Sequence, residues 1–154
     1  MSALILGVDP GRSGALALVA LDGVLVDVID MPEATGAALG THVRHWIDDH
    51  SPHTIGAAWV EKAGSRPGQG HVNVFTFGVG YGAILGCIGA LEVPTTIVHP
   101  GVWKRAMRVT ADKASSRQRA AELWPADARR FARVRDDGRA EAALIAEHGR
   151  RSGL

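Results

Sequence analysis

The sequence predicts an α/β domain built on a mixed five-stranded sheet, three antiparallel strands followed by parallel ones, flanked by helices. Residues 3–9 are a nearly continuous apolar run, which is expected of a central strand covered on both faces. Two more short apolar runs follow, separated by turn residues, and a segment with helical periodicity then leads into another short apolar run. At 154 residues, 46% hydrophobic and 21% charged, the chain suits one globular domain spanning residues 1–154.

The first three predicted strands form an antiparallel meander. Residues 10–14 make a turn after the first strand, because proline fixes one backbone dihedral and glycine permits positive φ. Residues 15–21 form the second strand and residues 24–31 the third. Asp22-Gly23 between them is typical of a tight hairpin turn.

A helix is predicted over residues 33–50, where apolar residues recur at helical spacing until Ser51-Pro52 ends the pattern. Residues 55–61 then form a strand that returns parallel to the first one. The apolar segment 72–91 is ambiguous, because its glycines disfavour a helix by about 1 kcal/mol each. Its length and the spacing of its small residues favour a helix that packs closely against another. The rest is predicted as a strand over 93–99, a helical turn over 100–107, helices over 113–124 and 139–148, and a basic loop over 125–135.

Four acidic residues lie where predicted elements end or begin: Asp9, Glu61, Asp137 and Glu141. A carboxylate directly after a buried strand is costly, because its charge is partly removed from water. Divalent cations make such a cluster tolerable, and hard cations prefer oxygen ligands. Each acid alone is more simply explained as a helix cap or a solvated strand end. Together they predict a Mg²⁺ or Mn²⁺ site.

This order of elements is the ribonuclease H-like arrangement. Its crossover helix returns the chain next to the first strand, so we expect Asp9 and Glu61 side by side at one edge of the sheet. The last helix could present Asp137 and Glu141 to the same point, since residues four apart share a helical face.

Such a cluster suits phosphodiester hydrolysis. The reaction develops negative charge on the attacking and leaving oxygens, and two cations about 4 Å apart stabilise both. We expect Asp9 to bridge two ions, Glu61 to hold one, and Glu141 with Asp137 to hold the other.

Several motifs resemble those of one nuclease family, in order along essentially the whole chain. Leu6-Gly7-Val8-Asp9-Pro10-Gly11, followed by Gly14, resembles the opening motif of the RuvC-like Holliday junction resolvases. Val60-Glu61 resembles the second acidic strand end of that family, and residues 137–146 resemble its closing helix. Residues 100–104, Pro-Gly-Val-Trp-Lys, are similar to the viral and phage members, which implies a phage origin.

The resemblance implies a homodimer with a ribonuclease H fold that cuts branched DNA, the four-way junction above all, with two Mg²⁺ or Mn²⁺ ions in each active site. It also implies that Lys104 and Lys113 lie near the scissile phosphate, with Lys113 in a catalytic role. In cellular members the last two acids are three residues apart, so Asp136 is an alternative to Asp137 as the fourth ligand. Cellular members also carry an aromatic residue after the second acid. Here the loop over 64–70 has none, and contact with the junction centre would fall to Arg66, Gln69 or His71.

Basic residues gather in the second half of the chain, although the net charge is only +1. This distribution suggests an anionic partner such as nucleic acid, whereas the simpler reading is a set of solvated helix faces. The predicted DNA contacts are Arg12, Arg66, Gln69, His71, Lys104, Lys113 and Arg117, with Arg119, Arg129, Arg130, Arg133 and Arg135 as further phosphate contacts taken as a group.

The glycine-rich segment 72–91 allows two interpretations. It is either a core helix against the sheet or a close helix–helix contact between two subunits. Resolving a four-way junction takes two symmetric cuts, and a twofold dimer presents two equivalent sites, so we favour the dimer. Its expected contacts are Phe75, Phe77 and Tyr81 as anchors, with Gly78, Gly82 and Gly86 permitting approach.

The composition also bounds other functions. The lone Cys87 excludes an intramolecular disulfide and a CxxC metal site. We expect a cytoplasmic protein without a membrane partner, because no signal peptide precedes the first strand and no uninterrupted apolar stretch reaches spanning length. The alternatives are another ribonuclease H-fold nuclease that cuts flaps or RNA–DNA hybrids, an actin-like ATPase, or an inactive junction-binding protein.

Overall fold

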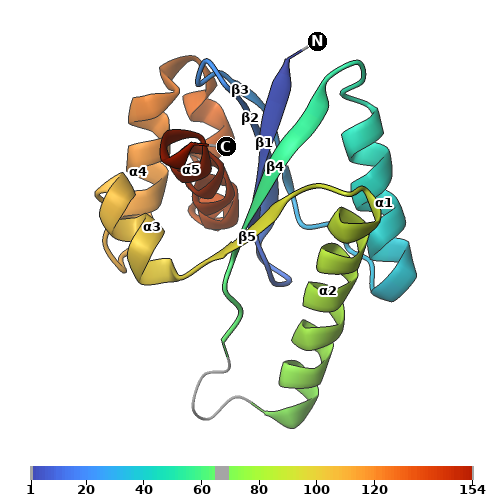
Figure 1. The fold of residues 1–154 in the computed structure, drawn as a ribbon. Helices are drawn as coiled ribbons and strands as arrows, with labels where there is room; N and C mark the ends of the chain where they lie inside the picture. The colour runs from blue at the N-terminus through green and yellow to red at the C-terminus, as the bar shows by residue number, and fades with distance from the viewer. Residues whose placement is uncertain (1, 65–69, 154) are drawn as a thin grey trace.

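A five-stranded mixed sheet forms the centre of the computed structural model, which describes residues 2–64 and 70–153 (Figure 1). The strand order is β3-β2-β1-β4-β5; β1, β2 and β3 are antiparallel neighbours, and β4 and β5 run parallel to β1. The predicted fold class is therefore confirmed. The strands are β1 (Ala3–Asp9), β2 (Ala15–Ala20), β3 (Leu25–Asp30), β4 (Thr54–Glu61) and β5 (Thr95–Val98).

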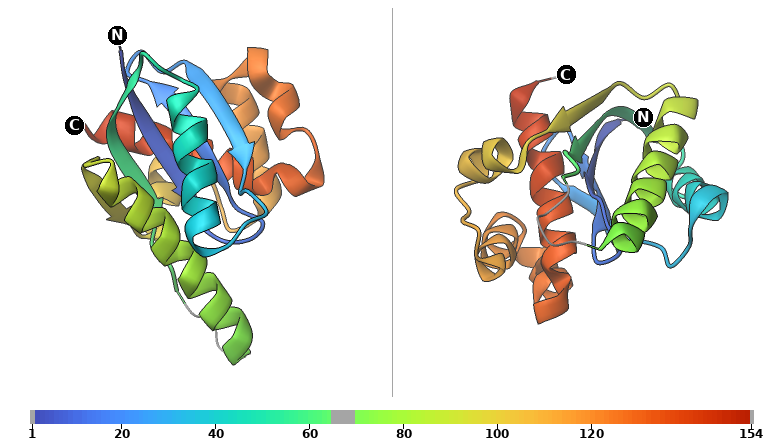
Figure 2. Two further views of the ribbon diagram at one scale, coloured as in Figure 1. Left: turned by 90° about the vertical axis from the view of Figure 1, so that its right-hand side faces the viewer. Right: turned by 90° about the horizontal axis from the view of Figure 1, so that it is seen from below.

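Helices cover both faces of the sheet (Figure 2). α1 and α2 pack on one face, and α3, α4 and α5 pack on the other. Side chains of β1 alternate between the two resulting cores: Leu4, Leu6 and Val8 enter the first, and Ile5 enters the second. The apolar run of β1 thus fits a strand buried on both faces. The helices are α1 (Gly36–Asp48), α2 (His71–Ala90), α3 (Pro100–Met107), α4 (Lys113–Leu123) and α5 (Asp137–Ser152).

The segment predicted as a basic loop over 125–135 is more ordered than expected. It contains two short 3-10 helices, Pro125–Phe131 and Val134–Asp136. Phe131 is 2% exposed and lies 6.2 Å from Trp124 between ring centroids. Proline begins the first of these helices, and the buried phenylalanine anchors its end. The loop prediction was wrong because it followed the many arginines and not these two residues.

The ambiguous segment forms α2, as the helical interpretation predicted. Only 11% of its most apolar 18-residue window is buried, and that window has a mean hydropathy of 1.5. By length and composition alone this helix could cross a membrane, so the expectation that no apolar stretch reaches that length was wrong; the interspersed glycines do not lower the hydropathy enough. One such helix is weak evidence for a membrane, because core helices of water-soluble proteins meet the same criterion.

Helix α5 lies against β1 with almost no side-chain material between the two backbones. An ideal Cβ added at Gly7 would come within 2.1 Å of the Ala142 carbonyl oxygen and 2.5 Å of the Ala146 nitrogen. A Cβ at Gly138 would lie 2.4 Å from the Ser13 carbonyl oxygen. Glycine at these positions therefore fixes how deeply α5 sits on the sheet.

Replacing Gly7 with alanine is expected to destabilise the fold by roughly 3 kcal/mol, the upper end of the range for overpacked cores. The atoms in the way are helix backbone, which cannot turn aside. Urea denaturation measures the effect, with Gly101→Ala as the control, because Gly101 is an exposed helical position where an added Cβ meets only the His99 ring, at an ordinary 3.6 Å. The control should gain up to about 1 kcal/mol from helix propensity. Equal effects at the two positions would contradict the close packing described above.

Candidate active site

Asp9 and Glu61 end two adjacent parallel strands. Val8 of β1 pairs with Val60 of β4, so the following two residues lie next to each other at the same end of the sheet. The β1–β4 register shifts where Gly56 is bypassed between the pairs Leu4–Ile55 and Ile5–Ala57, as expected of a β-bulge at glycine. By strand alternation both acids face α5.

Glu141 approaches the same point from α5, as expected. It is 7% exposed, and its Oε1 lies 3.2 Å from Lys104 Nζ and 3.5 Å from the Ser116 hydroxyl, which donates to it. Burial raises the pKa of Asp9 well above its ordinary value, and the negative charges of Glu141 and Glu61 raise it further. Three carboxylates therefore share one poorly solvated region.

Two lysines partly offset these charges. Lys113 and Lys104 lower the pKa of Asp9, against the larger effect of its burial. Lys113, predicted to be catalytic, is the first residue of α4, and its side chain is 63% exposed. Lys104 is less exposed and lies on α3, with its ammonium 5.2 Å from the centre of the Trp103 ring.

Asp137 has other partners. It forms an ion pair and hydrogen bond with Arg117, and its Oδ2 lies 4.0 Å from Lys113 Nζ. Asp136, the alternative fourth ligand, is buried and accepts hydrogen bonds from the Arg133 guanidinium and backbone amide. Burial alone would raise the pKa of Asp136, but the bonds from Arg133 lower it below its ordinary value. Asp137 thus shares Lys113 with Asp9, whereas Asp136 is bound to Arg133.

Helix α3 contributes a residue that the sequence did not single out for the site. Trp103 is fully buried, and its indole Nε1 donates to Glu61 Oε2 at 2.7 Å. Its position between a strand end and a basic residue was visible in the sequence, but nothing local indicated which acceptor the indole would reach.

The donor set suits a hard divalent cation. Asp9, Glu61 and Glu141 supply only oxygen, and the pKa of Asp9 is raised because burial and the two neighbouring acids disfavour its ionised form. Within residues 2–64 and 70–153, however, no three His, Cys, Asp or Glu side chains are already arranged to hold a metal ion. Lys104 and Arg117 pair with Glu141 and Asp137 instead.

Solved structures of Holliday junction resolvases share this architecture. Thermus thermophilus RuvC in complex with a Holliday junction substrate matches with a TM-score of 0.68 and 18% identity, covering 98% of this chain and 96% of the other. The fold is ribonuclease H-like. A further Thermus thermophilus RuvC structure matches with a TM-score of 0.64 and 17% identity, covering 97% of this chain and 96% of the other. The yeast mitochondrial Holliday junction resolvase Ydc2 matches with a TM-score of 0.65 and 16% identity, covering 97% of this chain and 78% of the other.

At these identities the similarity to RuvC and Ydc2 concerns the fold, over nearly the full length of the chain. No protein-family model matches the sequence, and no curated protein matches it significantly.

The predicted DNA contacts are spread around the acids. Arg12 is exposed in the turn after β1, and His71 is exposed at the first position of α2. Arg117 is tied to Asp137. Arg66 and Gln69 lie outside the described residues, so their predicted contacts stay predictions.

Most of the arginines expected to bind phosphate have acidic partners in the fold. Arg119 pairs with Glu122, Arg130 with Asp27 and Asp127, and Arg133 with Asp136. Arg129 and Arg135 are exposed. The sequence interpretation missed three other exposed cations near the site, for which no ion pair is found in the described part of the chain: Lys62, directly after Glu61, and Arg105 and Arg108 on and after α3.

The predicted dimer contacts on α2 fall into two groups. Phe75 is 74% exposed, and an added Cβ at Gly78 or Gly82 would meet no atom within 4 Å. Phe77 instead lies toward the turn at Gly11 and stacks on Tyr81, which packs on the core under α1 and α2. Phe75, Gly78 and Gly82 could therefore contact a second subunit, whereas Phe77 and Tyr81 already pack within the chain.

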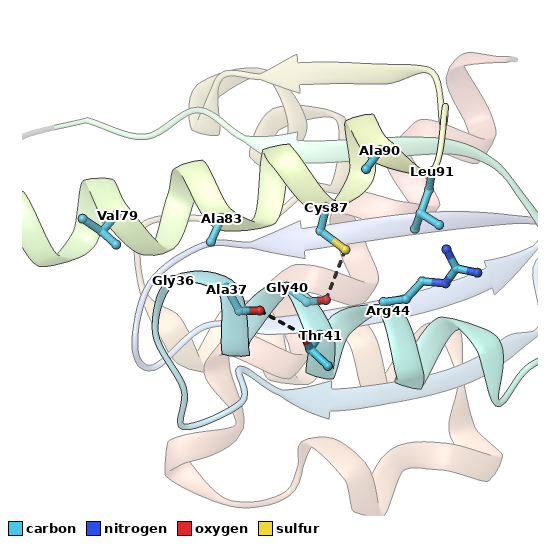
Figure 3. A pocket seen from close by; sticks show the side chains of 10 residues that line it. All are labelled: Gly36, Ala37, Gly40, Thr41, Arg44, Val79, Ala83, Cys87, Ala90 and Leu91. Carbon is cyan, nitrogen blue, oxygen red and sulfur yellow. Dashed lines mark hydrogen bonds between the residues drawn. The ribbon is translucent and has the colours of Figure 1, made fainter.

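A groove of about 630 Å³ runs between α1 and α2 (Figure 3). Its walls are small or apolar, apart from Thr41 and Arg44, and the Cys87 thiol donates to the Gly40 carbonyl across it. None of the four acids lines this groove, so it is separate from the candidate active site.

The raised pKa of Asp9 predicts a penalty on stability at neutral pH. The folded state holds the Asp9 proton more tightly than the unfolded chain does, so stability should fall as pH rises from about 4, the ordinary pKa, through the folded value. The neutral variant Asp9→Asn should therefore be more stable than the unaltered protein at pH 8 in EDTA, by more than about 1 kcal/mol, the equivalent of one pKa unit. Chemical denaturation at pH 8 and pH 4.5 measures the free energy of unfolding of the two proteins. The difference between them should be smaller at pH 4.5. A difference that is absent or independent of pH would contradict the assignment.

Proposed function

We propose that the protein is a metal-dependent endonuclease that resolves Holliday junctions and related branched DNA. The observation that carries the proposal is the meeting of Asp9, Glu61 and Glu141 at one end of a RuvC-like sheet, with the pKa of Asp9 raised by its burial and by the other two acids. A partly buried carboxylate whose pKa is raised by two other acids costs stability, and such a cost is typical of functional sites.

The acids would hold the ions as follows. Asp9 would contact both, Glu61 one, and Glu141 with Asp137 the other. Two bound Mg²⁺ or Mn²⁺ ions would lower the pKa of an attacking water and stabilise the charge that develops on the phosphodiester oxygens. Lys104 and Lys113 provide ammonium groups beside the carboxylates, where they would hold the scissile phosphate.

A second candidate is a junction-binding protein that does not cut. The observation in its favour is that Lys104 and Arg117 already pair with two of the four acids, Glu141 and Asp137. A flap or RNA–DNA hybrid nuclease would use the same acids on a different substrate. Cleavage assays separate these candidates.

The dimer is part of the proposal. α2 has two buried residues in twenty, Ile84 and Ile88, and exposes Val72 at 78% and Phe75 at 74%. Its exposed glycines would let a second backbone approach, and paired symmetric cuts require two sites facing one junction. A homodimer through α2 would cover this apolar face.

The decisive experiment compares four labelled substrates with and without Mg²⁺: a mobile four-way junction, a duplex, a flap and an RNA–DNA hybrid. The protein should sediment as a dimer at micromolar concentration and cut the junction symmetrically only when Mg²⁺ is present. Asp9→Asn should abolish cutting, because it removes the central charge, while leaving junction binding equal or tighter. Equal cutting of duplex, or activity retained by Asp9→Asn, would contradict the proposal. Binding without cutting would favour the second candidate, and a monomer would contradict the dimer.

Junction binding should depend on the exposed cations rather than on the paired arginines. Lys62→Ala and Arg105→Ala should each weaken binding and reduce the slope of log K against log [salt] by about 1. Arg44→Ala is the control, because Arg44 lies on α1 and pairs with Asp48 at 2.8 Å. Fluorescence anisotropy at several salt concentrations measures the slopes. Unchanged slopes for both site variants, or an equal change for Arg44→Ala, would exclude this surface from DNA binding.

A further inference from the structure

Trp103 is a buried polar group that the proposed chemistry does not use. Its side chain is fully buried in the core under α3, α4 and α5, and its indole N–H donates to Glu61 Oε2 at 2.7 Å. A buried indole N–H needs an acceptor, and hydrogen bonds to ionised acceptors are the shorter and stronger ones. The indole therefore holds one oxygen of Glu61 in a fixed place.

A bond between tryptophan and an acid is not by itself a sign of function. In the same protein Trp46 donates to Asp27 at 2.8 Å, and Trp124 donates to the backbone carbonyl of Gly23 at 2.8 Å. Asp27 lies on β3 and also accepts a hydrogen bond from Arg130. What distinguishes Trp103 is that its acceptor, Glu61, ends β4 next to Asp9 at the end of β1.

Helix α3 is built to hold this contact in place. It follows β5 directly, and Val98 at the end of β5 pairs in register with Glu61. Proline begins the helix, the His99 side chain accepts from the Gly101 amide, and Met107 anchors the last turn in the core. The indole is thus positioned from the strand that neighbours its acceptor.

The next residue on α3 acts on the third acid. Lys104 lies 3.2 Å from Glu141 Oε1, so consecutive residues of one short helix bind the two carboxylates that flank Asp9. Lys104 has a flexible stem and is partly exposed, so it can leave its acid. Trp103 is fully buried and cannot.

We propose that Trp103 is a positioning residue that fixes the orientation of Glu61 for binding a divalent cation. This inference rests on the proposed metal site. Groups that hydrogen-bond to metal ligands typically change metal affinity 10- to 100-fold when removed, because the ligand loses its orientation.

The test compares Trp103→Phe with Trp124→Phe. Both variants lose one buried indole hydrogen bond from the same core, so both should lose similar thermal stability. Calorimetric titration with MnCl₂ in the absence of DNA should show roughly 10- to 100-fold weaker binding for Trp103→Phe and unchanged binding for Trp124→Phe. Equal affinities in the two variants would overturn the inference.

A second measurement uses the unaltered protein and avoids any folding defect. The indole N–H signal of Trp103 in a ¹⁵N-resolved NMR spectrum should shift on titration with Mg²⁺, while that of Trp124 stays in place. A stationary Trp103 signal alongside shifting signals around Asp9 would overturn the inference and leave the proposed nuclease standing. Absence of any Mn²⁺ or Mg²⁺ binding would overturn both the inference and the proposed metal-dependent nuclease.

Discussion

The close approach of α5 to β1 is the constraint on which the rest of the structure depends. Glycine at position 7 lets the helix backbone rest on the strand, and Gly149 sits on the Trp59 ring, where an added Cβ would lie 2.3 Å from a ring carbon. The small residues of α5 continue this contact with Ala142 and Ala146. Because α5 sits so deep, the carboxylate of Glu141 reaches the end of β1, which a larger spacing between helix and sheet would prevent.

That packing creates an electrostatic problem which the neighbouring helices partly solve. The pKa of Asp9 is raised by its burial and by the charges of Glu141 and Glu61. α3 supplies an indole to Glu61 and an ammonium to Glu141, and α4 supplies Lys113. The two lysines lower the pKa of Asp9, but it stays above its ordinary value. The remaining deficit of positive charge is what gives the site its proposed affinity for divalent cations.

The sequence predicted the sheet well, with Asp9 and Glu61 at neighbouring strand ends, because this arrangement follows from local signals. The apolar run before Asp9, the Asp22-Gly23 turn and the crossover into the strand ending at Glu61 each have a short-range cause. The partners of the arginines could not be predicted in this way. Arg130 reaches Asp27 from more than a hundred residues away in the sequence, and such pairs depend on the tertiary fold. The same holds for the Trp103 contact with Glu61, since an indole donor has many possible acceptors.

The most direct test of the central claim is a crystal structure of the protein soaked in Mn²⁺, with the ions located by their anomalous scattering. The account predicts a peak within coordination distance of Asp9 and of at least one of Glu61 and Glu141, with α5 still resting on Gly7. An electron-density map in which Mn²⁺ binds elsewhere, while Asp9 keeps only protein neighbours, would contradict it.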